Sequence, residues 1–163
     1  MKPLVKVLLI GCGSLAFLGL ALVVGLGVWL FSGPESGVKL GNEMDLYALD
    51  YLSEHEILEP GEEILAYYDA TMSMDGTEAA ILTSERVLYH KAGRTASIPI
   101  QEIEDIRHRK EPLVGDVIEV QAVSGEVMKI EIAPLNLGET FLNVLKTTWK
   151  NAPSEVAEAE SGD

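Results

Sequence analysis

The stretch Asp116–Ala133, DVIEVQAVSGEVMKIEIA, contains two runs in which apolar and polar residues alternate. A period of two residues places successive side chains on opposite faces of a β-strand. Ser124-Gly125 separates the two runs and is typical of a tight hairpin turn. We therefore predict two antiparallel strands, each with one face against a core and one face in water. The residues expected to face the core are Ile118, Val120, Ala122, Met128, Ile130 and Ile132.

The same alternation extends upstream to Glu62 and is interrupted by the turn signals Asp75-Gly76 and Ala92-Gly93. A single helical turn is predicted at 101–103, and a longer helix at 139–150, where apolar residues recur every three or four positions. This order indicates a mainly β fold, a seven-stranded antiparallel barrel or sandwich that the C-terminal helix caps. The seven strands are predicted at 62–71, 77–83, 86–91, 94–100, 105–110, 116–123 and 127–133. The apolar stripe of the helix consists of Phe141, Val144, Leu145, Thr148 and Trp149.

The run from Val7 to Phe31 contains no charged side chain. About 20 helical residues cross the hydrocarbon core of a bilayer, so we predict that segment 1–31 is a transmembrane helix whose partner is the lipid bilayer. Lys2 and Lys6 precede the run, whereas only Lys39 follows it closely, which favours a cytoplasmic N-terminus. The side of the membrane that carries the rest of the chain is left open.

A second interpretation of this segment is lipidation. Leu9-Ile10-Gly11-Cys12 resembles the lipobox of bacterial lipoproteins, in which the cysteine becomes an acylated N-terminus. However, only five apolar residues separate Lys6 from Cys12, and the apolar run continues well beyond the cysteine. We therefore favour a cysteine buried in a spanning helix and keep lipidation as the alternative.

Three further segments have distinct compositions. Residues 32–41 are rich in glycine and proline and are predicted to be a linker. Residues 42–59 are predicted to form an acidic amphipathic helix, which Asn42 would cap. Residues 152–163 contain acids and no base and are predicted to be a disordered tail. The apolar face of the acidic helix consists of Met44, Tyr47, Ala48, Tyr51 and Leu52.

Composition excludes several function classes. The 163 residues include 12 Lys and Arg against 26 Asp and Glu, a net charge of -14, which argues against nucleic acid as a partner. A single cysteine excludes an intrachain disulfide and a zinc site built on several thiolates. His55 lies among acids, but adjacent helix positions do not face one another, so we predict no metal site. The sequence contains no recognisable catalytic motif and no phosphate-binding glycine loop, and we predict a protein that is not an enzyme and needs no cofactor.

Three stretches of the β-rich part resemble a known family. They are Glu63-Ile64-Leu65, then Ile81–Tyr89 with the sequence ILTSERVLY, and then Ile98–Ile106 with the sequence IPIQEIEDI. Together with seven strands and a final helix, they resemble the pleckstrin-homology (PH)-like fold, in particular its bacterial members and the related GRAM modules. The resemblance covers residues 60–151.

This resemblance implies a non-catalytic binding module that holds lipid headgroups, peptides or other protein domains. It also implies a bacterial protein, which the apolar run would place in the inner membrane as a single-pass protein. Members that bind phosphoinositides carry basic residues around the first hairpin. Here the hairpin 71–76 reads TMSMDG and contains no base and one acid, so we predict that phosphoinositides are not bound.

The charges suggest one candidate binding surface. Six of the ten bases that follow residue 31 fall within 25 residues, whereas the segment 43–59 contains six acids and no base. The bases could dock the acidic helix, form an open patch for anionic lipid, or be ordinary solvated sheet charges. The function predicted from the sequence is a membrane-anchored binding or scaffold module for a protein partner, and the alternative is a reader of anionic lipid surfaces. The candidate basic patch comprises Arg86, Lys91, Arg94, Arg107, Arg109 and Lys110.

Overall fold

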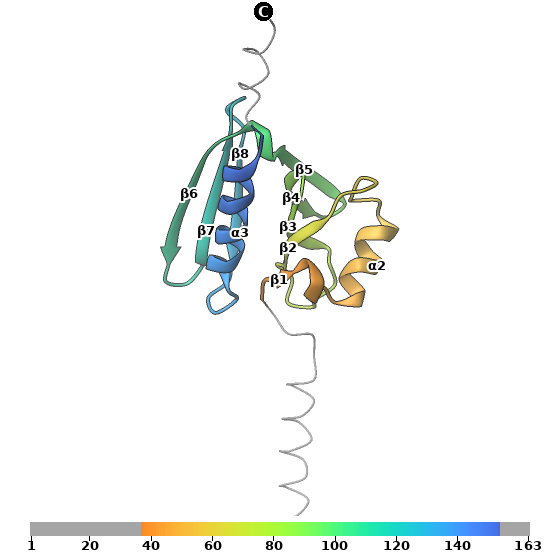
Figure 1. The fold of residues 1–163 in the computed structure, drawn as a ribbon. Helices are drawn as coiled ribbons and strands as arrows, with labels where there is room; N and C mark the ends of the chain where they lie inside the picture. Colours follow the sequence, from red (N-terminus) through yellow and green to blue (C-terminus); the bar gives the residue numbers. More distant parts are fainter. Residues whose placement is uncertain (1–36, 154–163) are drawn as a thin grey trace, which may run out of the picture. The chain divides into compact units, whose positions relative to one another are not determined.

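Eight strands form two antiparallel sheets in the computed structural model, which describes residues 37–153 (Figure 1). The first sheet has the order β1-β2-β3-β4-β5 and the second the order β6-β7-β8. The first sheet contains β1 (Lys39–Leu40), β2 (Ile64–Asp69), β3 (Glu78–Thr83), β4 (Arg86–Lys91) and β5 (Arg94–Pro99). The second contains β6 (Ile103–Glu111), β7 (Gly115–Ala122) and β8 (Val127–Ile132). The seven predicted strands correspond to β2–β8, and each boundary agrees within two residues.

The expectation of seven strands in a barrel is corrected in two respects. The eighth strand is β1, which lies in the predicted linker and pairs with β2 through Lys39↔Tyr67 and Leu40↔Ala66. Within residues 37–153 the two sheets share no strand pairing, so no closed barrel forms. β5 ends at Pro99, which has no N–H to donate, and the 3-10 turn η2 (Ile100–Glu102) then leads the chain into the second sheet.

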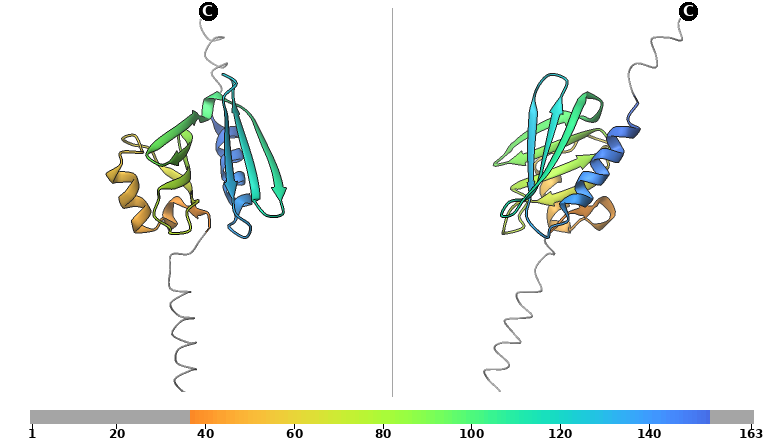
Figure 2. Two further views of the ribbon diagram at one scale, coloured as in Figure 1. Left: turned by 180° about the vertical axis from the view of Figure 1, so that it is seen from behind. Right: turned by 90° about the vertical axis from the view of Figure 1, so that its left-hand side faces the viewer.

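The main core lies between the two sheets and is covered by α3 (Gly138–Asn151), which is seen between them in Figure 1 and in the left view of Figure 2. Phe141 and Leu145 are completely buried there, and each contributes roughly 1.5–3 kcal/mol through the removal of its side chain from water. Trp149 packs against the edge of this core, and its Nε1–H donates to the Ile103 carbonyl at 3.0 Å. The predicted C-terminal helix and its apolar stripe are confirmed.

A second core covers the other face of the first sheet. Ala48 and Leu52 of α2 (Leu46–Glu54) pack there against side chains of β2, β3 and β4. The first sheet is therefore buried on both faces, which explains why the last four residues of β2 are all buried. The sheet residues in this second core are Ile64, Tyr67, Ala79, Ile81 and Leu88.

The acidic helix is shorter than the predicted range 42–59. The 3-10 turn η1 (Gly41–Glu43) precedes it, and Met44 and Asp45 are extended, so Asn42 does not cap α2. The helix ends at Glu54, and Glu56 takes a left-handed conformation with φ 49°. The apolar face was predicted correctly, because its five residues all belong to the second core.

Several predictions concern residues outside the described range. They are the membrane span 7–31 with the alternative at Cys12, residues 32–36 of the linker, and the tail from residue 154 onwards. In the part of the chain that the structure describes, neither α2 nor α3 has the length and apolar character needed to cross a bilayer.

Candidate functional site

The six candidate bases do not converge on one surface. Arg86 and Lys91 occupy the two ends of β4, and Arg94 begins β5. The other three belong to β6 in the second sheet. Five of the six form ion pairs with carboxylates, and Arg94 is the only one of them without an ion pair among residues 37–153.

Arg86 is part of the interior of the domain. Its Nε and Nη2 donate to the two carboxylate oxygens of Glu62 at 2.7 and 2.9 Å, and its Nη1 lies 3.1 Å from Glu59. The side chains of Arg86 and Glu62 are only 19% and 4% exposed. Burial acts to raise the pKa of Glu62, but hydrogen bonds from Arg86, the Glu59 N–H and Thr83 outweigh it, so this pKa is lowered. Arg86 therefore fastens segment 56–62 to β4 and is unavailable as a free cation.

Acids flank the two arginines of β6 on the outer face of the second sheet. Arg107 donates to Asp105 at 2.9 Å, and Arg109 donates to Glu119 at 2.6 Å and to Glu111 at 2.8 Å. These groups are largely exposed, and such pairs contribute little to stability. Their arrangement nevertheless gives this face mixed charge.

Lys91 and Lys110 are also paired. Lys91 lies 2.9 Å from Glu78 on the neighbouring strand, and Lys110 lies 2.6 Å from Glu139 at the start of α3. The candidate patch is thus a set of separate ion pairs on two sheets.

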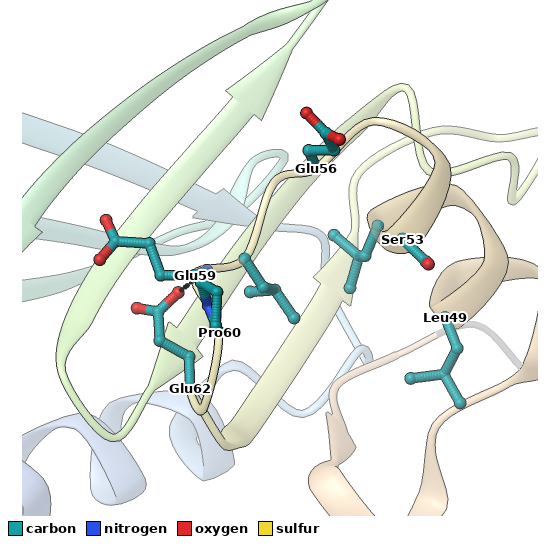
Figure 3. A pocket seen from close by; sticks show the side chains of 8 residues that line it. Leu49, Ser53, Glu56, Glu59, Pro60 and Glu62 are labelled. Carbon is teal, nitrogen blue, oxygen red and sulfur yellow. Dashed lines mark hydrogen bonds between the residues drawn. The ribbon is translucent and has the colours of Figure 1, made fainter.

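A groove lies beside α2 (Figure 3). It has a volume of about 630 Å³ and lies between the helix and segment 56–62. Its apolar lining includes Leu49, a large aliphatic residue that is 40% exposed on α2. The whole lining is Leu49, Leu52, Ser53, Glu56, Leu58, Glu59, Pro60 and Glu62.

The rim of this groove is acidic, and among residues 37–153 no base lines it, although Arg86 contacts Glu59 and Glu62 from β4. Glu56 is exposed, and the side chain of Glu59 is 71% exposed although it touches Arg86. Figure 3 shows Glu59 and Glu62 together at one end, where the Glu59 N–H donates to Glu62 at 2.7 Å, and Leu49 and Ser53 on the helix opposite. An apolar floor with an acidic rim suits a ligand that combines an apolar group with a cation.

The groove was not predicted from the sequence. The groove exists because the helix stops at Glu54 and the following residues fold back over β4. The feature of the sequence that could have indicated the groove is the presence of two apolar residues, Leu49 and Leu58, within an acidic stretch.

The three histidines have separate surroundings. His55 stacks on Tyr51 with ring centroids 4.0 Å apart, and the Tyr51 hydroxyl lies 3.2 Å from His90 Nε2. His90 is buried, and this burial lowers its pKa. The charge of His55 lowers the pKa further, by a smaller amount. His108 Nε2 lies 2.7 Å from the Asp116 carboxylate. Residues 37–153 contain no group of three or more His, Cys, Asp and Glu side chains suited to a metal ion.

The hairpin 71–76 is organised by carboxylates. Asp69 is buried and accepts hydrogen bonds from the Thr71 N–H, the Thr71 hydroxyl and the Gly76 N–H. Asp75 accepts from Ser73 and Thr77, and these bonds lower its pKa to about 2. The loop thus presents negative charge where phosphoinositide-binding relatives are expected to present positive charge.

Comparisons with known proteins agree with this architecture. Residues 58–147, more than half of the chain, match the family model described as "Bacterial PH domain". No curated protein matches the chain. The fold is similar to the crystal structure of a DUF1696 family protein with a pleckstrin-homology domain from Shewanella loihica PV-4 (9% identity, TM-score 0.50), over 71% of this chain and 99% of that one. PH-like domains are generally non-catalytic binding modules, and this chain belongs to the bacterial PH domain family.

Proposed function

We propose that this protein is a membrane-anchored, non-catalytic PH-like module that binds a protein partner through the groove between α2 and segment 56–62. The anchor rests on the charge-free run from Val7 to Phe31. The partner proposal rests on the combination of apolar lining and acidic rim in the groove. A binding role agrees with membership of the PH family, although a fold alone does not specify the ligand.

The chemistry of the groove indicates the kind of partner. Leu49 and Leu58 offer apolar surface to a buried side chain, and Glu56 offers an exposed carboxylate to Lys or Arg. Glu59 is 71% exposed and could add a second contact while it remains paired with Arg86. We therefore expect a protein segment in which an apolar residue is flanked by basic residues. Complementary charge would favour such a segment over the acidic or neutral surfaces of other proteins.

The alternative function is a reader of anionic lipid surfaces that uses the bases of β6. It has less support, because Arg107, Arg109 and Lys110 each lie within 3 Å of a carboxylate. To bind a lipid phosphate, each of these bases would first have to give up its contact with a carboxylate. The net charge of -14 would also repel an anionic surface.

Site-specific photo-crosslinking of the full-length protein in its native membrane tests the proposal. A photoreactive residue at Leu49 should give a crosslinked protein adduct, whereas one at Val127, which is 56% exposed on β8, should give none. Glu56→Lys combined with Glu59→Lys should abolish the adduct, and Glu126→Lys should leave it unchanged. An adduct that survives the double charge reversal would refute groove binding. Crosslinks from position 107 to phospholipid, lost on Arg109→Gln, would favour the alternative.

A further inference from the structure

Large apolar side chains are exposed at one end of the domain. Leu113 is 94% and Leu135 98% exposed, and Leu137 is 60% exposed. They lie on the β6–β7 turn and on the connection from β8 to α3. Met72, on the connection from β2 to β3, is fully exposed as well. We call Leu113, Leu135 and Leu137 the leucine end.

These connections lie next to one another. The β6–β7 turn and the connection after β8 together line a hollow of about 320 Å³ that includes Pro112, Pro134 and Leu135. The Cβ of any larger residue at Gly115 would lie 2.2 Å from the Ile132 carbonyl oxygen, so the two segments are in close contact. Figure 1 and both views of Figure 2 place these connections, together with that from β2 to β3, at the same end of the unit.

The described chain begins at this same end. The Val38 N–H donates to the Asn136 carbonyl at 3.0 Å, so Gly37 lies beside the connection that carries Leu135 and Leu137. Only residues 32–36 separate Gly37 from the apolar run that ends at Phe31. Six Cα-to-Cα steps extend no further than about 20 Å.

The backbone at the leucine end is unfavourable for leucine. Leu135 and Leu137 have φ values of 72° and 61°, a left-handed region in which glycine and asparagine are far less strained. Their exposed side chains do not supply core packing that would offset this strain.

We infer that the leucine end rests in the interfacial layer of the bilayer that anchors the protein, with Leu113, Leu135 and Leu137 inserted among the lipids. This inference rests on the membrane anchor of the proposed function. The contact is apolar, because Lys110 at this end is paired with Glu139. It therefore requires neither phosphoinositides nor anionic lipid, and the short connection keeps this end close to the membrane.

Fluorescence of the full-length protein reconstituted in phosphatidylcholine vesicles tests the inference. In a Cys12→Ala background, an environment-sensitive dye is attached to Leu113→Cys or to Leu135→Cys. Matched controls are Val123→Cys and Val127→Cys, two exposed valines at the β7–β8 turn. Spin-labelled lipids in the vesicles report direct contact between the dye and lipid. All four positions are exposed, so the substitutions leave the core intact.

The dyes at 113 and 135 should emit at shorter wavelength than the controls and be quenched by spin-labelled lipid, equally at low and high salt. Emission and quenching equal to those of the controls would overturn the inference. A shift to shorter wavelength without lipid quenching would also overturn it, because a protein would then cover the leucines. Resistance of the protein to carbonate extraction is measured in parallel. If the protein is extracted, the anchor itself fails, whereas retention with unquenched dyes refutes only the leucine contact.

Discussion

At the scale of single residues, the pair Arg86–Glu62 joins the groove to the sheet. Glu62→Gln keeps the shape of the side chain and removes its charge. The largely buried guanidinium of Arg86 then lacks its main carboxylate partner. We expect the free energy of unfolding to fall by about 2–4 kcal/mol. Chemical denaturation measures this change, and Glu63→Gln, at an exposed neighbouring position, is the control that should change it by less than about 0.5 kcal/mol.

The same pair predicts a pH dependence. The pKa of Glu62 is lower in the folded protein than its ordinary value, so its ionisation stabilises the fold above that ordinary value. This contribution is lost as the pH falls through the folded-state pKa. The stability difference between the wild type and Glu62→Gln should therefore be largest near neutral pH and shrink in acid. A difference that stays constant between neutral pH and strong acid would contradict the assignment.

Two adjacent tyrosines offer a matched comparison. Tyr67 is 2% exposed, and its hydroxyl has no hydrogen-bond partner among the described residues. The Tyr68 hydroxyl accepts from the Ala133 N–H at 3.1 Å and from Asn136 at 3.3 Å. Tyr67→Phe should raise the free energy of unfolding by about 1 kcal/mol, because it removes an unsatisfied buried group. Tyr68→Phe should lower it by a similar amount, and thermal unfolding of both variants would reveal the opposite signs.

At the scale of elements, the start of α3 depends on a close contact. A Cβ at Gly138 would lie 2.5 Å from the Asp116 Cβ, and Asp116 is itself fixed by His108. Helix propensity alone predicts that Gly138→Ala stabilises the protein by about 1 kcal/mol. The contact predicts the reverse, a loss of roughly 1–3 kcal/mol. Melting temperatures of Gly138→Ala and of the control Thr140→Ala distinguish the two, and a rise for Gly138→Ala would contradict the packing described.

Most elements could be predicted from the sequence because their signals are local. Alternation identified β2–β8, and the stripe with Phe141 identified α3, since a strand or helix with one buried face repeats its own period. β1 was missed because two residues contain no period. The end of α2 was placed too late because the left-handed turn at Glu56 has no glycine or asparagine to indicate it.

At the scale of the whole molecule, the unpredicted features depend on contacts between distant segments. The separation of the two sheets, the second core under α2 and the groove each require knowledge of which faces meet. The candidate patch illustrates the same limit: six bases that are close in sequence lie on two sheets. Their carboxylate partners range from a position two residues away, as for Arg109 and Glu111, to one 29 residues away, as for Lys110 and Glu139.

The excess of acids also makes a prediction for the whole molecule. With a net charge of -14, unpaired carboxylates repel one another in the compact state. Raising the NaCl concentration from about 10 to 150 mM shortens the Debye length from about 30 to 8 Å and should increase the melting temperature. A decrease would mean that the surface ion pairs of β6 outweigh the general repulsion. An uncharged osmolyte of equal osmolality is the control.

The start of the described chain is fixed to the domain at two points. β1 is paired with β2, and Val38 is bonded to Asn136, so the chain is fastened to the first sheet and to the connection before α3 from its first described residues onward. The first described residues therefore belong to the folded unit. In Figure 1 segment 56–62 lies at the end opposite the leucine end. The groove and the leucine end therefore occupy separate surfaces of the described unit, so the two proposed contacts, a protein in the groove and lipid at the leucine end, would not compete for the same residues.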